Sequence, residues 1–366
     1  MPQGENHMNE YIKHIKTSDF QKNLIAWYHT VKRDLPWRNS LDPYRILVSE
    51  IMLQQTQVIT VIPYYKRFME LFPTAKDLAS ATEEELLKAW EGLGYYSRAR
   101  HLQASAKMID ELGTFPTAYE DILKLKGVGP YTAGAIASIA FGTPACAVDG
   151  NVFRVISRIG AIFDDIAKPA TRKLFESIIA EMIPHDKPGD FNQGLMELGA
   201  TICTPKSPKC LECPVKPYCL AYAEGTDDQL PVKSKPVKKK KIKFIVGVIE
   251  NEQGEWLLVK RPATGLLAGF YEFKQIEYEA GYPEEILKGY LINIGYNVKQ
   301  LEFFRFRKHV FTHRIWEMEA YKVLVDARFG MFKENEIWVK PEELAKYSLA
   351  VAHVKILENA ATSPNL

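Results

Sequence analysis

Two carboxyl side chains stand in sequence contexts that suit acid–base chemistry. Glu50 lies in a helical pattern beside the apolar residues Val48 and Ile51, and desolvation there would raise its pKa and retain a proton. Asp149 ends a loop and precedes another helical pattern. One neutral and one ionised carboxyl group could protonate a leaving group and stabilise a cation. The simpler alternatives are a solvated helix face for Glu50 and an N-cap for Asp149.

Four of the five cysteines fall within seventeen residues. Six, two and five residues separate them in turn, at Cys203, Cys210, Cys213 and Cys219. A reducing cytosol disfavours disulfides, so such a group is expected to bind a metal. Four thiolates can hold zinc or an iron–sulfur cluster. Cys146 stands apart and is interpreted as a small buried hydrophobe.

A glycine-rich turn joins two helical patterns. Gly127 and Gly129 are followed by Pro130, which suits the first turn of a helix. Glycines permit a close backbone approach, and the free N–H groups at a helix N-terminus attract anions. The turn therefore predicts a phosphate-binding hairpin, and a tight helix–helix turn without a ligand is the alternative.

The whole chain has the composition of a globular protein with more than one domain. Its 366 residues exceed one ordinary core, and 46% hydrophobic with 25% charged residues exclude a fully disordered chain. No apolar stretch is long enough to span a membrane, and no signal peptide is evident, so a cytoplasmic protein is expected. The formal net charge of +2 means that any nucleic-acid surface must come from local clustering.

The elements that position these residues differ between the two halves of the chain. Before residue 227 the apolar spacing is helical, with clear helix starts at Asp42-Pro43 and at Thr82. A lysine-rich linker is expected at 227–243. After it, strands are predicted at 244–249, 256–259, 310–318 and 320–325, and a helix at 284–294. The second half is therefore expected to be α+β.

Several motifs together resemble the helix-hairpin-helix/Gly-Pro-Asp DNA glycosylases, and within them the adenine-specific mismatch glycosylase (MutY) family. They are Leu35–Arg38, Ser49–Thr56, Gly92–Arg98, Gly129–Thr132 and Val148–Val152. The resemblance extends from about Asp19 to Ile356. It implies an all-α helix-hairpin-helix glycosylase with a [4Fe–4S] loop, followed by an α+β Nudix-like domain. The expected parts are a tail (1–18), an iron–sulfur domain (19–36 with 144–226), a six-helix module (37–143), the linker (227–243) and the Nudix-like domain (244–360).

The resemblance also implies roles for individual residues. Glu50 would protonate adenine at N7, ionised Asp149 would stabilise the oxocarbenium ion, and Tyr131 and Asn151 would orient the aspartate and the sugar. Bifunctional relatives carry a lysine where this chain has Tyr131, so lyase activity should be absent or weak. DNA contacts are expected from Gly127, Gly129, Arg38, Gln54, Gln55, Thr56 and Tyr95. For the glutamines and the tyrosine, surface and core positions are the ordinary alternatives.

The cysteine spacing and the C-terminal half complete the resemblance. The gaps match the [4Fe–4S] loop of endonuclease III-like glycosylases, so an iron–sulfur cluster is favoured over zinc. The C-terminal half lacks the glutamate box of active Nudix hydrolases, so phosphohydrolysis is not expected. Phe311, Thr312 and His313 correspond to the Phe-Ser-His loop with which the family inspects 8-oxoguanine.

The resemblance therefore implies an enzyme that removes adenine mispaired with 8-oxoguanine or guanine in double-stranded DNA, and a monomer is expected. Two alternatives remain open at this point. One is an endonuclease III-like bifunctional glycosylase and AP lyase. The other is a non-catalytic DNA-damage binding protein, which would not need the Glu50 and Asp149 pair.

Overall fold

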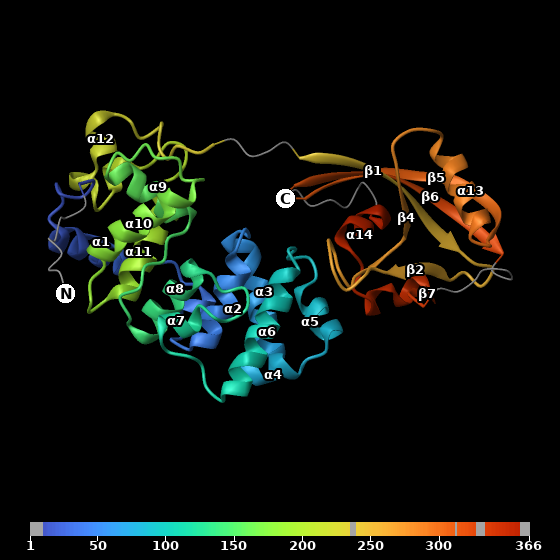
Figure 1. Ribbon diagram of the computed structural model, residues 1–366, viewed down its shortest axis with the longest axis horizontal. Helices are drawn as coiled ribbons and strands as arrows, with labels where there is room; N and C mark the ends of the chain where they lie inside the picture. Colours follow the sequence, from blue (N-terminus) through green and yellow to red (C-terminus); the bar gives the residue numbers. More distant parts are fainter. Residues whose placement is uncertain (1–9, 235–238, 312, 327–333, 359–366) are drawn as a thin grey trace. The chain divides into compact units, whose positions relative to one another are not determined.

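The computed structural model describes residues 10–234, 239–311, 313–326 and 334–358 (Figure 1). The chain divides into two compact units. The first comprises Met1–Thr82 with Ser97–Lys235, and the second comprises Glu83–Tyr96 with Pro236–Leu366. This division assigns 83–96, expected in the six-helix module, to the second unit. Within the described residues no helix is both long enough and apolar enough to cross a membrane.

The first unit is helical, as expected. Its helices are α1 (Thr17–Val31), α2 (Pro43–Leu53), α3 (Val58–Leu71), α4 (Ala75–Ser80), α6 (Ser97–Leu112), α7 (Tyr119–Ile122), α8 (Pro130–Phe141), α9 (Gly150–Ile159), α10 (Pro169–Met182), α11 (Pro188–Thr201) and α12 (Leu220–Glu224), with 3₁₀ turns at Pro36–Arg38, Cys210–Glu212 and Lys216–Tyr218. The helix start at Asp42-Pro43 is confirmed, because the Asp42 carboxylate accepts a hydrogen bond from the Tyr44 N–H over 2.9 Å. That cap fixes the beginning of α2, the helix that carries Glu50.

One hydrophobic core of this unit combines α1 with α9, α10 and α11. Phe20 and Leu24 of α1 are fully buried there against residues such as Phe191 and Leu195 of α11. Ile12 and Ile15, assigned from the sequence to an N-terminal tail, are also buried in this core. The packing therefore begins before residue 19, in the turn that precedes α1.

The glycine-rich turn connects α7 to α8 and requires its first glycine. Gly127 has a φ of +74°, and a Cβ built on it would lie 2.6 Å from the Cβ of His101. Gly129 is the N-cap of α8, with an ordinary φ of −100°, and Pro130 begins the helix. The hairpin therefore has the expected form, with the N-terminus of α8 directly after the glycines.

The second unit contains a seven-stranded sheet of order β3-β2-β1-β6-β5, with β4 paired to β1 and β7 to β2. The strands are β1 (Lys240–Glu250), β2 (Trp256–Lys260), β3 (Tyr271–Glu272), β4 (Lys274–Tyr278), β5 (Asn297–Val310), β6 (Arg314–Asp326) and β7 (Glu336–Val339), and the helices are α5 (Glu83–Trp90), α13 (Pro283–Asn293) and α14 (Val351–Leu357), with a 3₁₀ segment at Pro341–Lys346. The pair β1 and β6 is parallel, and the other pairs are antiparallel.

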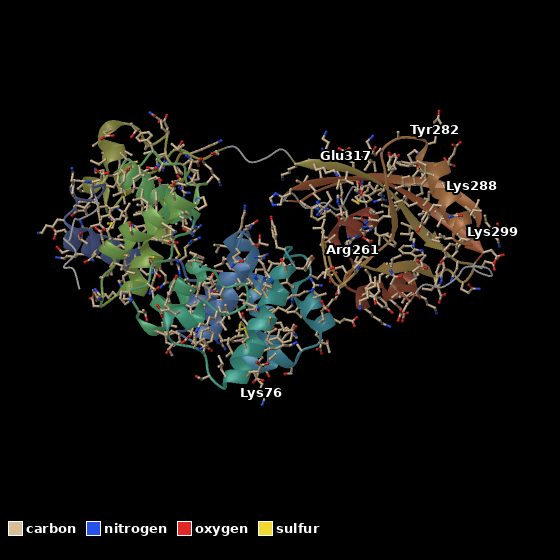
Figure 2. All side chains as sticks on the ribbon, viewed as in Figure 1. Lys76, Arg261, Tyr282, Lys288, Lys299 and Glu317 are labelled. Carbon is tan, nitrogen blue, oxygen red and sulfur yellow. The ribbon has the colours of Figure 1, made fainter. Side chains whose placement is uncertain are left out.

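Each face of the sheet has its own core. Ile245 packs with Leu287 and Leu291 of α13, whereas Phe244 packs with Ile356 of α14. Successive residues of a strand face opposite sides, so the apolar run in β1 serves both cores. Tyr282 and Lys288, labelled in Figure 2, are exposed and lie on the outer side of the α13 region.

The strand predictions at 244–249 and 256–259 and the helix at 284–294 are confirmed. The prediction of one strand at 310–318 is wrong, because β5 ends at Val310 and β6 begins at Arg314. The predicted piece at 320–325 belongs to the same strand, β6. Both ends of the expected linker 227–243 also join the flanking units. Arg158 donates a hydrogen bond to the Asp227 carbonyl over 2.9 Å, and Lys240 begins β1.

Candidate active site

A pocket of about 710 Å³ in the first unit brings Glu50 and Asp149 together. Residues between 28 and 58, between 131 and 172 and between 190 and 200 line it, so it joins α2, the start of α8, the start of α9 and α11. Its volume lies within the range of small-molecule pockets. Both carboxyl groups, Tyr131 and Asn151 line this one pocket, although 99 positions separate Glu50 from Asp149.

Glu50 is a buried carboxyl group with 7% of its surface exposed. Burial raises its pKa to about 7, and the nearby charge of Asp149 adds to the rise, whereas a hydrogen bond with Tyr131 and the charge of Arg38 oppose it. No described group forms a hydrogen bond with its Oε2 atom. Glu50 therefore retains a proton close to neutral pH, as a general acid requires.

Asp149 accepts hydrogen bonds at both of its carboxylate oxygens, whereas Oε2 of Glu50 has no donor among the described residues. It is the N-cap of α9, where Oδ1 accepts from the Val152 N–H over 2.8 Å and Oδ2 accepts from the Asn151 amide over 2.9 Å. Burial raises its pKa, while these donors and the charge of Arg154 oppose the rise. Hydrogen bonds to the charged form stabilise it. These donors stabilise the ionised form of Asp149. The capping role considered as its alternative is also present.

Asn151 is held in the orientation that serves Asp149. Nη2 of Arg154 donates to Oδ1 of Asn151 over 2.9 Å, so the amide nitrogen is turned toward the aspartate. Nη2 of Arg154 also donates to the Gly199 carbonyl over 2.7 Å. A Cβ at Gly199 would lie 2.6 Å from the Cβ of Asn151. Residue 199 must therefore be glycine for α11 to approach the start of α9 this closely.

Tyr131, in the first turn of α8, contributes a neutral hydroxyl group. Burial raises its pKa well above the usual value, and the carboxyl groups of Glu50 and Asp149 add to the rise. Its hydroxyl also lies 3.7 Å from Sδ of Met196. A phenol in this position can donate a hydrogen bond, but it cannot form an imine.

Arg38, predicted as a DNA contact, is engaged within the protein. Its Nη2 donates to Oε2 of Glu197 over 2.7 Å, and Nε of Arg33 donates to Oε1 of the same carboxylate over 2.6 Å. Burial alone would raise the pKa of Glu197, but the two arginines outweigh it and lower the pKa. Glu197 was not predicted. Its position in the apolar run Leu195–Leu198 is the same signal that identified Glu50.

Of the other four side chains predicted to contact DNA, three line the pocket and one belongs to the second unit. Gln54, Gln55 and Thr56 follow the end of α2 and line the pocket. Gln55 has a left-handed backbone with a φ of +58°. Tyr95 is 44% exposed with a φ of +51° and belongs to the second unit. The roles of these four residues in DNA binding stay predictions.

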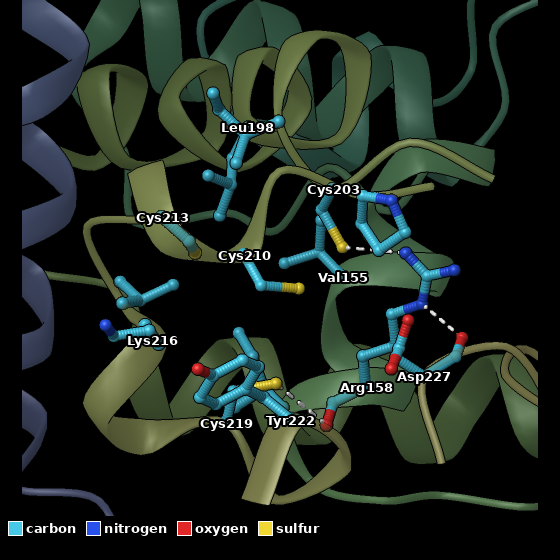
Figure 3. A pocket seen from close by; sticks show the side chains of 14 residues that line it. Val155, Arg158, Leu198, Cys203, Cys210, Cys213, Lys216, Cys219, Tyr222 and Asp227 are labelled. Atoms are coloured by element: carbon cyan, nitrogen blue, oxygen red, sulfur yellow. Dashed lines mark hydrogen bonds between the residues drawn. The ribbon is translucent and has the colours of Figure 1, made fainter. Parts of the chain in front are cut away.

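The four clustered cysteines line a second, separate cavity (Figure 3). Burial raises the pKa of Cys213 to about 12 and that of Cys219 to about 11. Nη1 of Arg158 lies 3.3 Å from Sγ of Cys203 and can donate to it. Across the described residues, no three His, Cys, Asp or Glu side chains converge as the ligands of a single metal ion would, and the four thiols are instead spread around this cavity. Four thiols around one cavity, with a cation beside them, match the ligand set of an iron–sulfur cluster.

The predicted 8-oxoguanine loop connects β5 to β6 in the second unit. Phe311 packs against His309 and Trp316, with ring centroids 4.5 Å and 4.9 Å apart, and its N–H bonds the Arg314 carbonyl. His313 is exposed. Thr312 lies outside the described residues. Phe311 is thus anchored in the domain, whereas His313 is accessible.

Comparisons with known proteins agree with this arrangement. Residues 48–181 match the HhH-GPD superfamily of base excision DNA repair proteins, residues 203–219 the iron-sulfur binding domain of endonuclease III, and residues 245–359 a NUDIX domain. The chain is 35% identical to an adenine DNA glycosylase of Mus musculus over 92% of this chain and 77% of that protein. It is 41% identical to an adenine DNA glycosylase of Arabidopsis thaliana over 71% of this chain. That match spans about half (48%) of the length of the Arabidopsis protein.

A solved structure resembles the helical part. A thermostable thymine-DNA glycosylase superposes with a TM-score of 0.52 at 32% identity, covering 57% of this chain and 97% of that one. The glycosylase fold of the relatives therefore coincides with the part of the chain that contains the pocket with Glu50 and Asp149.

Proposed function

The chain belongs to the adenine DNA glycosylase family of base-excision repair enzymes, and we propose that it hydrolyses the N-glycosidic bond of adenine paired with 8-oxoguanine or guanine in duplex DNA. The observation that carries the proposal is the Glu50 carboxyl, with a pKa near 7, in one pocket with the hydrogen-bonded Asp149. A non-catalytic binding protein would have no use for a buried carboxyl pair in opposite environments.

The geometry supports a division of roles between the two carboxyl groups. Adenine is a poor leaving group as an anion, so Glu50 donates its proton to the ring at N7. The Asp149 carboxylate stabilises the cationic sugar as the bond breaks. Water then adds at the sugar carbon, and the proton that it loses returns Glu50 to its acid form. Tyr131 and Asn151 hold the carboxyl groups in place. The base must leave the duplex to reach this pocket.

The cysteine loop contributes structure in this proposal. Cys203, Cys210, Cys213 and Cys219 would hold a [4Fe–4S] cluster, which when bound cross-links the loop through four thiolates. The family match at 203–219 supports this ligand set. The protein would act as a monomer on DNA.

Tyr131 supports a monofunctional enzyme. Lysine at this position would allow Schiff-base chemistry, and the phenol does not. Lys32, which is exposed, also lines the pocket. Because the Tyr131 phenol cannot form an imine, borohydride added during the reaction should trap no covalent protein–DNA complex. A trapped complex that Lys32→Ala abolishes would establish a lyase activity and contradict this part of the proposal.

The central experiment uses duplexes with adenine opposite 8-oxoguanine, guanine or thymine. Free adenine should be released from the first two, and strand cleavage should appear only after alkali treatment. Absence of adenine release from every duplex by the cluster-loaded protein would refute the proposal.

Recognition of 8-oxoguanine is assigned to Phe311, Thr312 and His313. Its test is a chain that ends at Ser234, because the segment 227–234 packs on the first unit through Arg158 and Asp165. This chain should still excise adenine but should lose its preference for 8-oxoguanine over guanine opposite adenine. An unchanged preference would contradict the assignment.

A further inference from the structure

The C-terminal end of α2 is capped by one buried arginine from another helix. Nη1 of Arg98, on α6, donates to the carbonyl groups of Ile51, Met52 and Gln54 over 2.9, 2.8 and 2.6 Å. Its Nη2 donates to Oγ1 of Thr56 over 3.2 Å. The last carbonyl groups of a helix have no partner within the helix. Arg98 therefore supplies donors that α2 itself cannot supply.

An arginine suits this position better than other residues. Only 7% of its surface is exposed, and burying a cation is costly unless hydrogen bonds compensate for the lost water. The planar guanidinium group can donate in several directions at once, and its charge is favourable at a helix C-terminus. Lysine would keep the charge but would lose the fixed fork of donors.

The capped segment is also a wall of the candidate active site. Glu50 lies in the last turn of α2, and Gln54, Gln55 and Thr56 follow it around the same pocket. Gln55 has a φ of +58°, a conformation that a residue with a side chain holds only when its neighbours fix it. The hydrogen bonds from Arg98 hold the carbonyl of Gln54 and the hydroxyl of Thr56, on either side of Gln55.

We propose that Arg98 is a positioning residue for adenine excision, which fixes the last turn of α2 and the Gln54–Thr56 turn so that Glu50 meets the substrate in a productive geometry. The proposal rests on the proposed function, and it goes further by assigning a role to a residue that does not line the pocket. It predicts that loss of Arg98 slows the chemical step more than it weakens DNA binding.

The test compares the full, cluster-loaded protein with Arg98→Ala and Arg98→Lys. Single-turnover excision is measured with enzyme saturating over an adenine:8-oxoguanine duplex, and affinity is measured separately by titration. Arg98→Ala should lower the single-turnover rate about 10- to 100-fold, since small misplacements of a catalytic group have effects of this size. Affinity should change by less than about threefold, and Arg98→Lys should recover only part of the rate.

Gln103 provides a matched control on the same helix. It is also buried, and its amide donates to the carbonyls of Leu78 and Ala81 at the end of α4 over 3.3 and 2.7 Å. Neither carbonyl belongs to a residue that lines the pocket. Gln103→Ala should therefore lower the melting temperature without changing the single-turnover rate below that temperature. Millimolar guanidinium should raise the rate of Arg98→Ala, and the same concentration of urea should not.

Two results would overturn the proposal. One is a single-turnover rate for Arg98→Lys or Arg98→Ala within about twofold of the wild-type rate, which is too small for a positioning role. The other is an equal rate loss in Gln103→Ala, which would show a general effect of instability. A wild-type protein that releases no adenine would instead refute the proposed function, so the two failures are distinguishable.

Discussion

Asn151 donates a hydrogen bond from its side-chain amide to Oδ2 of Asp149 over 2.9 Å. No described group bonds Oε2 of Glu50, on the other carboxyl of the same pocket. The two groups share burial but differ in donors. Because donors stabilise the charged form, the pocket favours one neutral and one ionised carboxyl group.

Replacing Glu50 with glutamine should remove the acid but keep its shape. We expect single-turnover excision to fall about 10²- to 10⁴-fold, the usual contribution of a general acid. Duplex affinity should stay close to wild type, because the substitution leaves the hairpin at Gly127 and Gly129 intact. Rapid-quench assays and fluorescence titration measure the two quantities. Near wild-type excision by Glu50→Gln would contradict the acid role.

The excision rate should fall as the pH rises through about 7, because the pKa of Glu50 is raised to about 7 and only its protonated form is the acid. It should also fall at low pH, where Asp149 becomes protonated. A pH profile of the single-turnover rate with the wild-type protein tests both limbs. A rate that keeps rising well above pH 7 would exclude Glu50 as the acid.

Glu50 should also make stability depend on pH. Its pKa is raised from 4.5 to about 7 in the folded protein, so its contribution is fully present below pH 4.5 and is lost as the pH rises through 7. Above that pH the buried charge costs up to about 3 kcal/mol. Glutamine cannot ionise, so Glu50→Gln should unfold at higher denaturant concentration than wild type at pH 8, with a smaller difference at pH 5. Equal pH dependence of the two proteins would argue against this raised pKa.

Removal of the Asn151 amide should weaken the anionic form of Asp149. Asn151→Ala is expected to lower the single-turnover rate about tenfold or more, because one charge-assisted hydrogen bond is lost. The low-pH limb of the rate profile should move to higher pH, since the pKa of Asp149 rises further. Asn23→Ala, on α1 outside the pocket lining, serves as the control. A lower rate with an unmoved low-pH limb would mean that Asn151 does not act through Asp149.

The two hairpin glycines should respond differently to alanine. Gly127→Ala is expected to destabilise the protein by about 1–3 kcal/mol, because its φ is +74° and the new Cβ would meet His101. At Gly129, φ is ordinary and no atom lies within 4 Å of an added Cβ. Gly129→Ala should leave the free energy of unfolding nearly unchanged. Urea unfolding measures both, and equal losses would refute the strain at Gly127.

Structural features that depend only on residues close together in the chain could be predicted from the sequence. Asp42-Pro43 begins α2, and Asp149 is the N-cap of α9, because capping needs only residues two or three positions away. The strands β1 and β2 and the helix α13 were predicted from the local pattern of their own apolar residues. The strand predicted across 310–318 was wrong, since the sequence has no Gly or Pro between the end of β5 and the start of β6 to mark the break.

Contacts between distant segments could not be predicted from composition or spacing. The ion pair of Arg38 with Glu197 joins residues 159 positions apart, and a lone arginine in a polar sequence gives no sign of such a partner. Likewise, the meeting of Glu50 with Asp149 came from family resemblance, and only the packing of α2, α8 and α9 displays it. Glu197 lay in an apolar run that could have identified it.

The burial of Phe20 and Leu24 among residues of α9, α10 and α11 has a consequence for biosynthesis. Helix α1 finds its apolar partners only after well over a hundred further residues have been translated, because α9, α10 and α11 lie that far along the chain. Until then its hydrophobic stripe stays exposed to chaperones and to other nascent chains. Such distant pairing slows collapse to the native state, so the helical unit should mature only after α11 has been translated, when the cysteine loop that follows it also becomes available to receive iron.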